Sequence, residues 1–490
     1  MIEVLSVASE IYPLIKTGGL ADVAGALPAA LGEHGVEMRT LVPGYPAVMA
    51  QMQAARPVAD LGSLHSGPAR LVAGRVEGLD LIVIDAPHLY DRPGNPYMAP
   101  DGWDWPDNWR RFAALSWVAH ELALGLVDGY RPQVLHAHDW QAGLVPAYVK
   151  FGPSDRIKTV MTVHNLAFQG TFGADIFGEL DLPPHAFSVA GVEYYGGVGY
   201  LKSGLECADI VTTVSPTYAA EIRMPEFGMG LDGLLNNRSD TVFGVLNGID
   251  LEAWDPSTDP SLVQPFTAGT THKRLANKAA LQEAFGLDRS DAPLFGLVSR
   301  LTWQKGIDLV AANIDLLVAL GGQIAVLGSG ETELENAIRG AAQRHPGRVG
   351  IVTGYNERLS HLVQGGSDFI LVPSRFEPCG LTQMYALRYG AIPIVSRVGG
   401  LNDTVIDANV AALSAGVATG IQFAPPVEPA FADALRRAFA LFADTENFRK
   451  MQRRGMKSDV SWTASAARYA QIYATLLGLD RDDDDDDQDD

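Results

Sequence analysis

The chain has 490 residues, too many for one ordinary hydrophobic core, so its length predicts two domains. Hydrophobic residues make up 47% of the chain and 51 residues are glycine, which suits an α/β protein with many tight turns and excludes a largely disordered chain. A formal net charge of −21 argues against broad contact with nucleic acid or an anionic membrane, and it favours a neutral polymer or a small molecule as substrate.

Short runs of Val, Ile and Leu alternate with longer helical patterns, which predicts parallel sheets built from strand–helix–strand units. In the first half of the chain the predicted strands span residues 3–8, 39–42, 79–84, 134–138, 159–163, 210–214 and 241–245. In the second half they span residues 294–298, 324–327, 349–352, 369–372 and 392–395. A final helix is predicted over residues 463–477.

These two sets of strands predict two Rossmann-like α/β domains, and the candidate ligand-binding motifs in both halves lead us to expect that the domains face each other across a deep cleft. The expected order is an N-terminal domain, a polar linker region, a C-terminal domain and a last helix, at residues 1–245, 246–272, 273–457 and 458–480. No strand follows this helix, so its pattern would let it pack on either domain, and we favour packing back on the N-terminal domain. The end of the chain, residues 481–490, contains eight aspartates, whose repulsion predicts a disordered acidic tail.

The sequence also favours a cytoplasmic protein. Cys207 and Cys379 are the only cysteines, too few for a disulfide framework, and both are expected to be reduced. We find no secretory signal pattern and no run of about 18 apolar residues that would suit a membrane span.

The first candidate site is the sequence Lys16-Thr17-Gly18-Gly19-Leu20, where the first strand gives way to the first helix. Adjacent glycines let a ligand approach the backbone, and the start of a helix offers unpaired N–H groups that suit an anion. Lys16 adds a mobile positive charge at the same place. Taken alone, such a glycine pair is more often only a turn.

Two further strand ends in the second half of the chain have similar chemistry. Residues 299–306 follow a predicted strand and contain Arg300 and Lys305, and residues 377–382 follow another strand and open a helix. Three such ends, one in the first half and two in the second, predict a diphosphate ligand.

His136 and His138 share one face of a predicted strand and precede Asp139, a pattern that could suggest a metal site. No further ligand at a recognisable spacing completes a zinc site, so no metal is expected.

Together these motifs resemble the ADP-glucose-dependent glycogen and starch synthases, which are retaining glucosyltransferases of the GT-B fold. The resemblance is carried by ordered motifs along the chain: Ser9-Glu10, Lys16 to Leu20, Pro106-Asp107-Asn108, His136 to Gln141, Thr162 to Asn165, Asn247 to Asp250, Ser299 to Gly306, Glu377 to Thr382 and Gly399-Gly400-Leu401. It implies an enzyme that transfers glucose from ADP-glucose to the nonreducing end of an α-1,4-glucan with retention of configuration and without a cofactor.

The resemblance also assigns roles to residues. In this family the N-terminal domain faces the acceptor and the C-terminal domain binds the nucleotide sugar. The implied catalytic residues are His164, Glu377, Arg300, Lys305 and Asp139. The implied donor-binding residues are Lys16, Gly18, Gly19, Asp22, Asn247, Arg300, Lys305, Tyr355, Cys379, Gly380, Leu381 and Thr382.

The chemistry of glucosyl transfer agrees with these roles. Negative charge grows on the leaving diphosphate, where Arg300 and Lys305 would neutralise it, and N–H groups at Leu381, Thr382, Gly18 and Gly19 would add fixed donors. No metal is then required.

One position departs from wider relatives of this fold, which often carry a second glutamate eight residues after the one that corresponds to Glu377. Tyr385 stands there, which fits the glycogen and starch synthase branch and puts ribose recognition by a carboxylate in doubt. The alternatives are a related glucosyltransferase that uses UDP-glucose or a small acceptor, and a non-catalytic glucan-binding protein. A glucan phosphorylase would need pyridoxal phosphate and usually has a longer chain.

Overall fold

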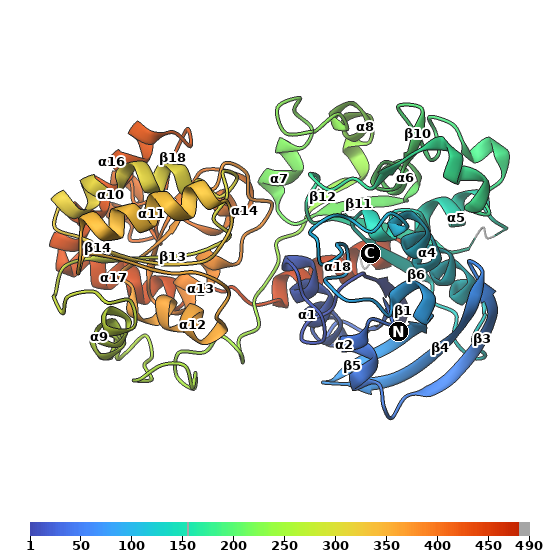
Figure 1. The fold of residues 1–490 in the computed structure, drawn as a ribbon, viewed down its shortest axis with the longest axis horizontal. Helices are drawn as coiled ribbons and strands as arrows, with labels where there is room; N and C mark the ends of the chain where they lie inside the picture. The colour runs from blue at the N-terminus through green and yellow to red at the C-terminus, as the bar shows by residue number, and fades with distance from the viewer. Residues whose placement is uncertain (154–155, 480–490) are drawn as a thin grey trace, which may run out of the picture. The chain divides into compact units, whose positions relative to one another are not determined.

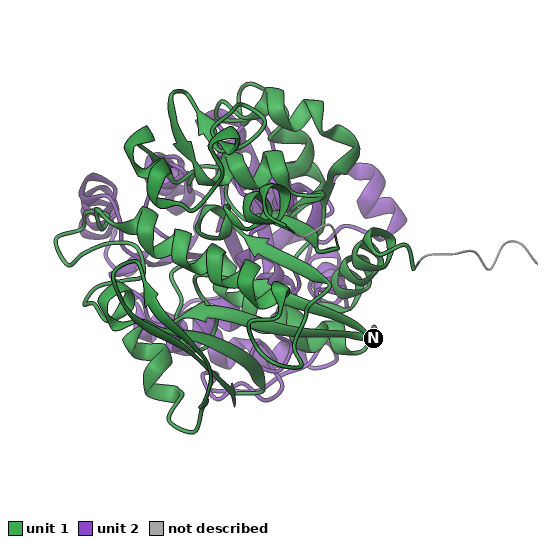
Figure 2. Cartoon of the chain, turned by 90° about the vertical axis from the view of Figure 1, so that its right-hand side faces the viewer, with its two compact units in different colours: residues 1–247, 462–490 green, residues 248–461 purple. Residues whose placement is uncertain are grey.

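The computed structural model describes residues 1–153 and 156–479, which form two compact units (Figure 2). Unit 1 comprises Met1–Asn247 and the chain from Trp462 onward, and unit 2 comprises Gly248–Ser461. Each unit is built on a parallel sheet, so the predicted α/β class with two Rossmann-like domains is confirmed. The predicted acidic tail, residues 481–490, lies outside the described residues.

Unit 1 contains a nine-stranded sheet with the order β12-β11-β7-β6-β1-β2-β5-β4-β3. The strands from β12 to β5 in this order pair in parallel. Their bounds are β1 (Ile2–Val7), β2 (Val36–Pro43), β5 (Leu79–Asp85), β6 (Val134–His138), β7 (Lys158–Val163), β11 (Ile210–Thr213) and β12 (Val242–Gly244). The predicted strands of the first half correspond to these seven, with ends that differ by up to three residues.

The sequence prediction missed the hairpin of β3 (Arg56–Leu64) and β4 (Gly67–Val76), a long antiparallel ribbon at the edge of this sheet (Figure 1). Its two-residue loop is His65-Ser66, and both residues have positive φ, 47° and 71°. Such loops usually contain Asn-Gly or Asp-Gly, so the usual hairpin signal is absent from the sequence.

A small three-stranded sheet also belongs to unit 1 and was not predicted: β8 (Thr171–Phe172), β10 (Gly197–Gly199) and β9 (Glu193–Tyr194). The helices of this unit are α1 (Gly19–Gly32), α2 (Pro46–Gln51), α3 (Pro87–Tyr90), α4 (Asn108–Leu124), α5 (Val145–Phe151), α6 (Tyr200–Cys207), α7 (Pro216–Glu221), α8 (Asp232–Asn237) and α18 (Thr463–Leu476). Short 3-10 turns span Trp140–Ala142, Ala174–Glu179, Pro184–Ala186 and Ser239–Thr241.

The last helix, α18, packs beside α1, which begins 444 residues earlier in the chain (Figure 1). Its buried side chains Ala466, Tyr469 and Ile472 share a hydrophobic cluster with Val23 and Leu27 of α1. The apolar face of α18 therefore completes the core of unit 1.

Unit 2 contains a six-stranded parallel sheet with the order β15-β14-β13-β16-β17-β18. Its strands are β13 (Leu294–Val298), β14 (Gln323–Leu327), β15 (Val349–Val352), β16 (Phe369–Val372), β17 (Ile392–Ser396) and β18 (Ile421–Phe423). Five of these were predicted, because strands buried on both faces read as continuous apolar runs. The short β18 was missed.

The helices of unit 2 are α9 (Arg274–Ala284), α10 (Ile307–Ala319), α11 (Thr332–Arg344), α12 (Glu357–Gly366), α13 (Thr382–Arg388), α14 (Gly399–Thr404), α15 (Val410–Ala415), α16 (Glu428–Ala443) and α17 (Thr445–Gly455), with a 3-10 turn at Thr271–Lys273. They surround hydrophobic clusters that contain the buried residues of all six strands.

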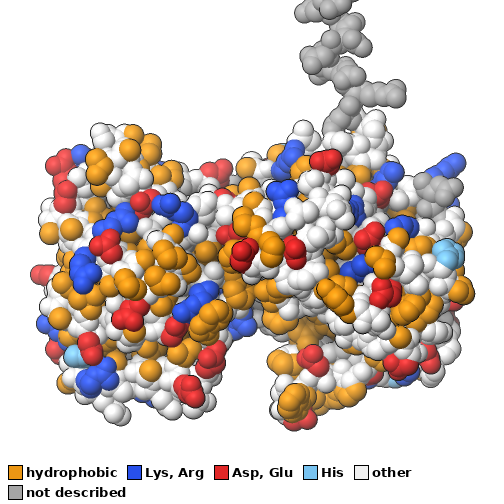
Figure 3. Space-filling model, turned by 90° about the horizontal axis from the view of Figure 1, so that it is seen from above, with side chains coloured by type: hydrophobic (Ala, Val, Ile, Leu, Met, Phe, Trp, Pro, Cys, Tyr) orange, Lys and Arg blue, Asp and Glu red, His pale blue; other side chains and the backbone are white. Residues whose placement is uncertain are grey.

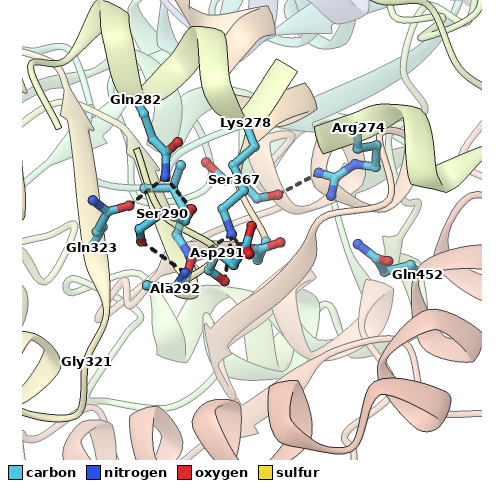
Figure 4. Close-up of polar contacts among 12 residues, drawn as sticks. Arg274, Lys278, Gln282, Ser290, Asp291, Ala292, Gly321, Gln323, Ser367 and Gln452 are labelled. Carbon is cyan, nitrogen blue, oxygen red and sulfur yellow. Dashed lines mark hydrogen bonds and ion pairs between the residues drawn. The ribbon is translucent and has the colours of Figure 1, made fainter. Parts of the chain in front are cut away.

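Polar side chains on one face of α9 bind the amino ends of the strands (Figure 4). Lys278 forms a buried ion pair with Asp368, with 2.7 Å between Nζ and Oδ2, and the same oxygen accepts the N–H of Leu294. Gln282 donates to Oε1 of Gln323 at 2.8 Å. These contacts fix the amino edge of the sheet, and the predicted site residues lie at the opposite, carboxyl edge.

On the face that Figure 3 shows, Lys and Arg side chains are interspersed with Asp and Glu side chains. No helix in the described part of the chain has the length and apolar character needed to cross a bilayer.

Candidate functional site

The predicted site residues follow the carboxyl ends of parallel strands in each unit. In unit 1, Asp139 follows β6 and His164 follows β7, two strands that are neighbours in the sheet. In unit 2, Arg300 follows β13 and Glu377 follows β16, which are also neighbours. Open α/β sheets place ligand-binding groups at this edge, because the loops there diverge to neighbouring helices.

The glycine-rich loop of unit 1 joins β1 to α1. Lys16 forms an ion pair with Asp22 in the first turn of α1, with 2.7 Å between Nζ and Oδ1. A Cβ atom added at Gly18 or Gly19 would meet no atom within 4 Å. The backbone at these two glycines is therefore not covered by other parts of the chain, and the side chains of Lys16 and Asp22, two of the predicted donor-binding residues, lie together.

Glu10 modifies the expected role of this loop. Its carboxylate accepts hydrogen bonds from the N–H and the hydroxyl of Thr17, from the N–H of Gly18 at 3.3 Å and from the hydroxyl of Tyr97. The N–H of Gly18 is thus already engaged and is not a free donor for a diphosphate. Glu10 was part of a recognised motif but was not a candidate site residue, because only the folded chain brings it beneath the loop.

Asp139 is half-buried and has a strained backbone, with φ of 54°. Its Oδ1 accepts the N–H of His164 at 2.7 Å, so it ties the ends of β6 and β7 together. Burial raises the pKa of Asp139 to about 7, although N–H groups of His164 and Asn165 act against this shift. This carboxyl group therefore holds a proton more readily than an ordinary aspartate does.

His164 belongs to a buried group of three histidines. Its Nε2 lies 3.0 Å from Nδ1 of His138, and the ring of His138 lies against that of His136, with 4.2 Å between the centroids. His136 bonds through Nδ1 to the hydroxyl of Tyr473 at 2.7 Å and through Nε2 to that of Thr162 at 2.6 Å. His136 and His138 are therefore packing and hydrogen-bonding residues.

Burial lowers the pKa of His136 and of His164 to about 3, and it lowers the pKa of His138 well below its ordinary value of 6.5. All three rings are neutral at pH 7. No group of three or more His, Cys, Asp or Glu side chains within residues 1–153 and 156–479 is arranged to hold a metal ion.

Asn247 is the last residue of the first segment of unit 1 and follows β12. Its side chain is buried, and its Oδ1 has no hydrogen-bond partner. A buried amide oxygen without a partner is costly, so this atom is suited to accept a hydrogen bond from a ligand.

An ion pair in the candidate site of unit 2 joins Lys305 to Glu377, with 2.6 Å between Nζ and Oε2. The same oxygen accepts the hydroxyl of Ser374 at 2.8 Å. Both charged side chains are largely buried, and they line a small cavity of about 30 Å³ with Ser299 and Thr382. The structure thus brings together Lys305, Glu377 and Thr382, and it adds Ser374, which the sequence analysis missed.

Arg300 lies on the same segment as Lys305 but is exposed, and within the described residues its side chain makes no hydrogen bond or ion pair. An arginine that is held by no carboxylate keeps its five donors for a bound anion. Lys305 is fixed by Glu377, whereas Arg300 is free to turn toward a ligand.

The loop between β16 and α13 holds Cys379, Gly380 and Leu381. Gly380 has φ of 74°, and the carbonyl groups of Cys379 and Gly380 both accept from the side chain of Gln383. A Cβ atom at Gly399 would lie 1.9 Å from the carbonyl oxygen of Glu377, so only glycine fits there. The Gly399-Gly400 motif, which had no predicted role, therefore packs against the backbone of the site loop.

Two tyrosines complete the region. Tyr355 is 79% exposed, and its ring is available to stack on a ligand. The ring of Tyr385 is not available, because it stacks on the ring of Trp254 with 3.6 Å between their centroids. The ring of His361 also stacks on Trp254, with 3.8 Å between the centroids. Tyr385, which stands where wider relatives have the second glutamate, therefore holds the segment around Trp254 against the rest of unit 2.

Two family models match the chain: the starch synthase catalytic domain over residues 3–237 and glycosyl transferases group 1 over residues 281–455. The glycogen synthases of Mesorhizobium japonicum and Methylocella silvestris are each 58% identical to it, over 475 and 477 residues. In both comparisons the match covers 97% of this chain and 99% of the relative.

Solved structures agree with these matches. The catalytic domain of starch synthase IV from Arabidopsis thaliana, bound to ADP and acarbose, has a TM-score of 0.87 at 33% identity and covers 97% of this chain and 99% of its own. Sucrose-phosphate synthase from Thermosynechococcus elongatus shares the fold, with a TM-score of 0.60 at 18% identity, and covers 98% of this chain and 100% of its own. The chain therefore belongs to the glycogen synthase family, glucosyltransferases of the GT-B fold.

Proposed function

We propose that this chain transfers glucose from ADP-glucose to the nonreducing end of an α-1,4-glucan, with retention of configuration and release of ADP. The observation that carries the proposal is the pair of cations on the segment after β13, with Lys305 fixed by Glu377 and Arg300 free. The starch synthase IV relative, which was solved with ADP and acarbose, supports the choice of a nucleoside diphosphate and a glucan.

The cations act on the leaving group. As the bond between the anomeric carbon and the diphosphate breaks, negative charge grows on the phosphate oxygen, and the fixed ammonium group of Lys305 needs no reorganisation to stabilise it. Arg300 adds a planar guanidinium group that binds phosphate oxygens in pairs. These two side chains supply the positive charge that a metal ion supplies in other enzymes.

The remaining predicted residues bind other parts of the donor, chiefly its glucosyl group. We assign Glu377 to the sugar hydroxyls, since its second carboxylate oxygen is not the one held by Lys305 and Ser374. In unit 1, Asn247 offers an unpartnered buried oxygen, and His164 offers a ring whose position is fixed by His138. Tyr355 is assigned to the adenine ring, and Cys379, Gly380, Leu381 and Thr382 to the wall of the donor site.

Retention follows from attack of the acceptor hydroxyl on the face that the diphosphate leaves. Asp139 is a poor candidate for a covalent nucleophile, because burial raises its pKa to about 7 and Oδ1 is bound to the N–H of His164. We therefore assign Asp139 to hydrogen bonding near the sugar.

The test supplies ADP-glucose and UDP-glucose separately with glycogen and measures both nucleotide release and polymer growth. We expect growth with ADP-glucose. Growth only with UDP-glucose, or nucleotide release without polymer growth, would contradict the proposed donor or acceptor, and glycogen binding without turnover would indicate a non-catalytic protein.

A further inference from the structure

Trp303 is an exposed aromatic residue on the segment between β13 and α10, and the function proposed above gives it no role. Its side chain is 55% exposed. Its backbone is held on both sides, since its N–H donates to Oε1 of Glu331 at 2.9 Å and its carbonyl accepts from Gly306 at 3.0 Å and from Arg375 at 2.7 Å. The position of this residue is therefore fixed without help from its ring.

The indole ring is fixed as well. The guanidinium carbon of Arg375 lies 4.3 Å from the ring centroid, within the range of a cation–π contact. Arg375 is itself held by two parallel hydrogen bonds to Asp308, of 2.7 Å and 2.6 Å. These bonds keep the pKa of Asp308 below its usual value, so the carboxylate remains a charged partner that holds the guanidinium group against the ring.

The exposed part of this ring contributes little to folding. Surface that remains in water gains no hydrophobic stabilisation, and the main-chain contacts already hold the segment. A rigid ring with an open surface is, however, suited to binding, because a ligand that stacks on it immobilises no further side chain. Trp303 differs in this respect from exposed aromatic residues that move freely.

The groups around the ring indicate the kind of ligand. A glucose ring has an apolar C–H face, which stacks on indole, and hydroxyl groups at its edge, which bind carboxylates and guanidinium groups. Asp308, Glu331 and Arg375 provide such groups beside Trp303. A nucleobase would need the aromatic surface but not this charged rim, and the exposed Tyr355 is assigned to it.

We propose that Trp303, Arg375, Asp308 and Glu331 form a glucan-binding subsite on unit 2, in which one glucose unit of an α-glucan stacks on the indole ring. This subsite is additional to the groups that bind the donor diphosphate and sugar. It rests on the proposed function for the identity of the polymer. Its role is to hold the acceptor polymer, and it takes no part in bond breaking.

The test measures glycogen binding without donor, by affinity electrophoresis in gels that contain glycogen. Trp303→Ala should raise the dissociation constant for glycogen about tenfold, because truncation of a stacked tryptophan at a binding site costs more than about 1 kcal/mol, and Trp303→Phe should retain most of the affinity. Trp103→Ala is the matched control, since Trp103 is 78% exposed and its ring has no recorded stacking partner in the described part of the chain.

Measurements of turnover and of ADP binding distinguish a glucan-binding role of Trp303 from a nucleobase-binding role. With Trp303→Ala we expect a higher KM for glycogen, a nearly unchanged kcat and an unchanged dissociation constant for ADP. Unchanged glycogen binding, or an equal loss with Trp103→Ala, would overturn the subsite, and so would weaker ADP binding with normal glycogen binding, which would place a nucleobase on the ring. Failure of the proposed function appears separately, as wild-type protein that binds glycogen but does not extend it with ADP-glucose.

Discussion

The two cations after β13 should differ in what their removal does, and the comparison of Lys305→Ala with Arg300→Ala tests the site. Both variants should lose turnover by about 10²- to 10³-fold, as expected when one preorganised group that stabilises transition-state charge is deleted. Only Lys305→Ala should also lose stability, because Lys305 is paired with Glu377, whereas Arg300 is exposed and held by no described residue.

The magnitude follows from the burial of the pair. The side chain of Lys305 is 19% exposed and that of Glu377 is 10% exposed, so removal of the ammonium group leaves a carboxylate that is mostly buried, with Ser374 as its remaining partner. Breaking a buried pair in this way costs about 3 kcal/mol, the lower end of the usual range, because some solvent reaches Lys305. The Arg300→Ala change should stay within about 0.5 kcal/mol of wild type.

The assays are urea unfolding and initial rates with ADP-glucose and glycogen. The double variant Lys305→Ala with Glu377→Gln serves as a control: it should recover much of the lost stability, because a neutral amide needs no counter-charge, and it should remain inactive. The reasoning is refuted if Lys305→Ala unfolds at the wild-type urea concentration, or if Arg300→Ala turns over at nearly the wild-type rate.

Three further outcomes are expected. A chelator should leave glucan extension unchanged, because Arg300 and Lys305 supply the positive charge; loss of activity that a divalent ion restores would show otherwise. The urea midpoint should fall as the pH is lowered from 7 to 5, because burial lowers the pKa values of His136, His138 and His164 and the unfolded chain then binds more protons than the folded chain. Asp139→Asn should steepen this fall, since the raised pKa of Asp139 lets the folded chain bind a proton and so opposes it. A midpoint that does not change with pH would contradict both statements. Truncation after residue 480 should not change turnover, since the last helix ends at Leu476, and a loss at equal folded content would give the tail a role in catalysis.

Most of the parallel sheets could be predicted from the sequence, for a physical reason. A strand that is covered on both faces has to be apolar throughout, as in β13 and β16, whose residues are almost entirely buried. The β3–β4 hairpin has one open face and contains polar residues, and its loop adopts positive φ without glycine at either position. The sequence therefore shows neither a continuous apolar run for these two strands nor the usual glycine-containing turn between them.

The site was predictable where its residues follow strand ends, because topology alone brings those ends to one edge of a sheet. Partners that arrive from elsewhere in the chain were not predictable. Glu10 engages the N–H of Gly18 only after the segment after β1 turns back, and Ser374 reaches Glu377 through the particular turn that follows β16. Hydrophobic periodicity carries no information about such contacts, since they depend on the direction of single polar side chains.

The C-terminal helix illustrates the same limit at long range. Its extent follows from its amphipathic pattern, but its contact with His136 does not, because Tyr473 is separated from that histidine by 337 residues. A buried neutral imidazole needs one acceptor and one donor, and Thr162 in β7 and Tyr473 in α18 provide the partners for its two nitrogens. The ring so fixed lies against His138, and His138 is bonded to His164. The last helix therefore does more than cover the core of unit 1: it completes the hydrogen bonds of His136, whose ring packs against the histidine that contacts the proposed sugar-binding ring.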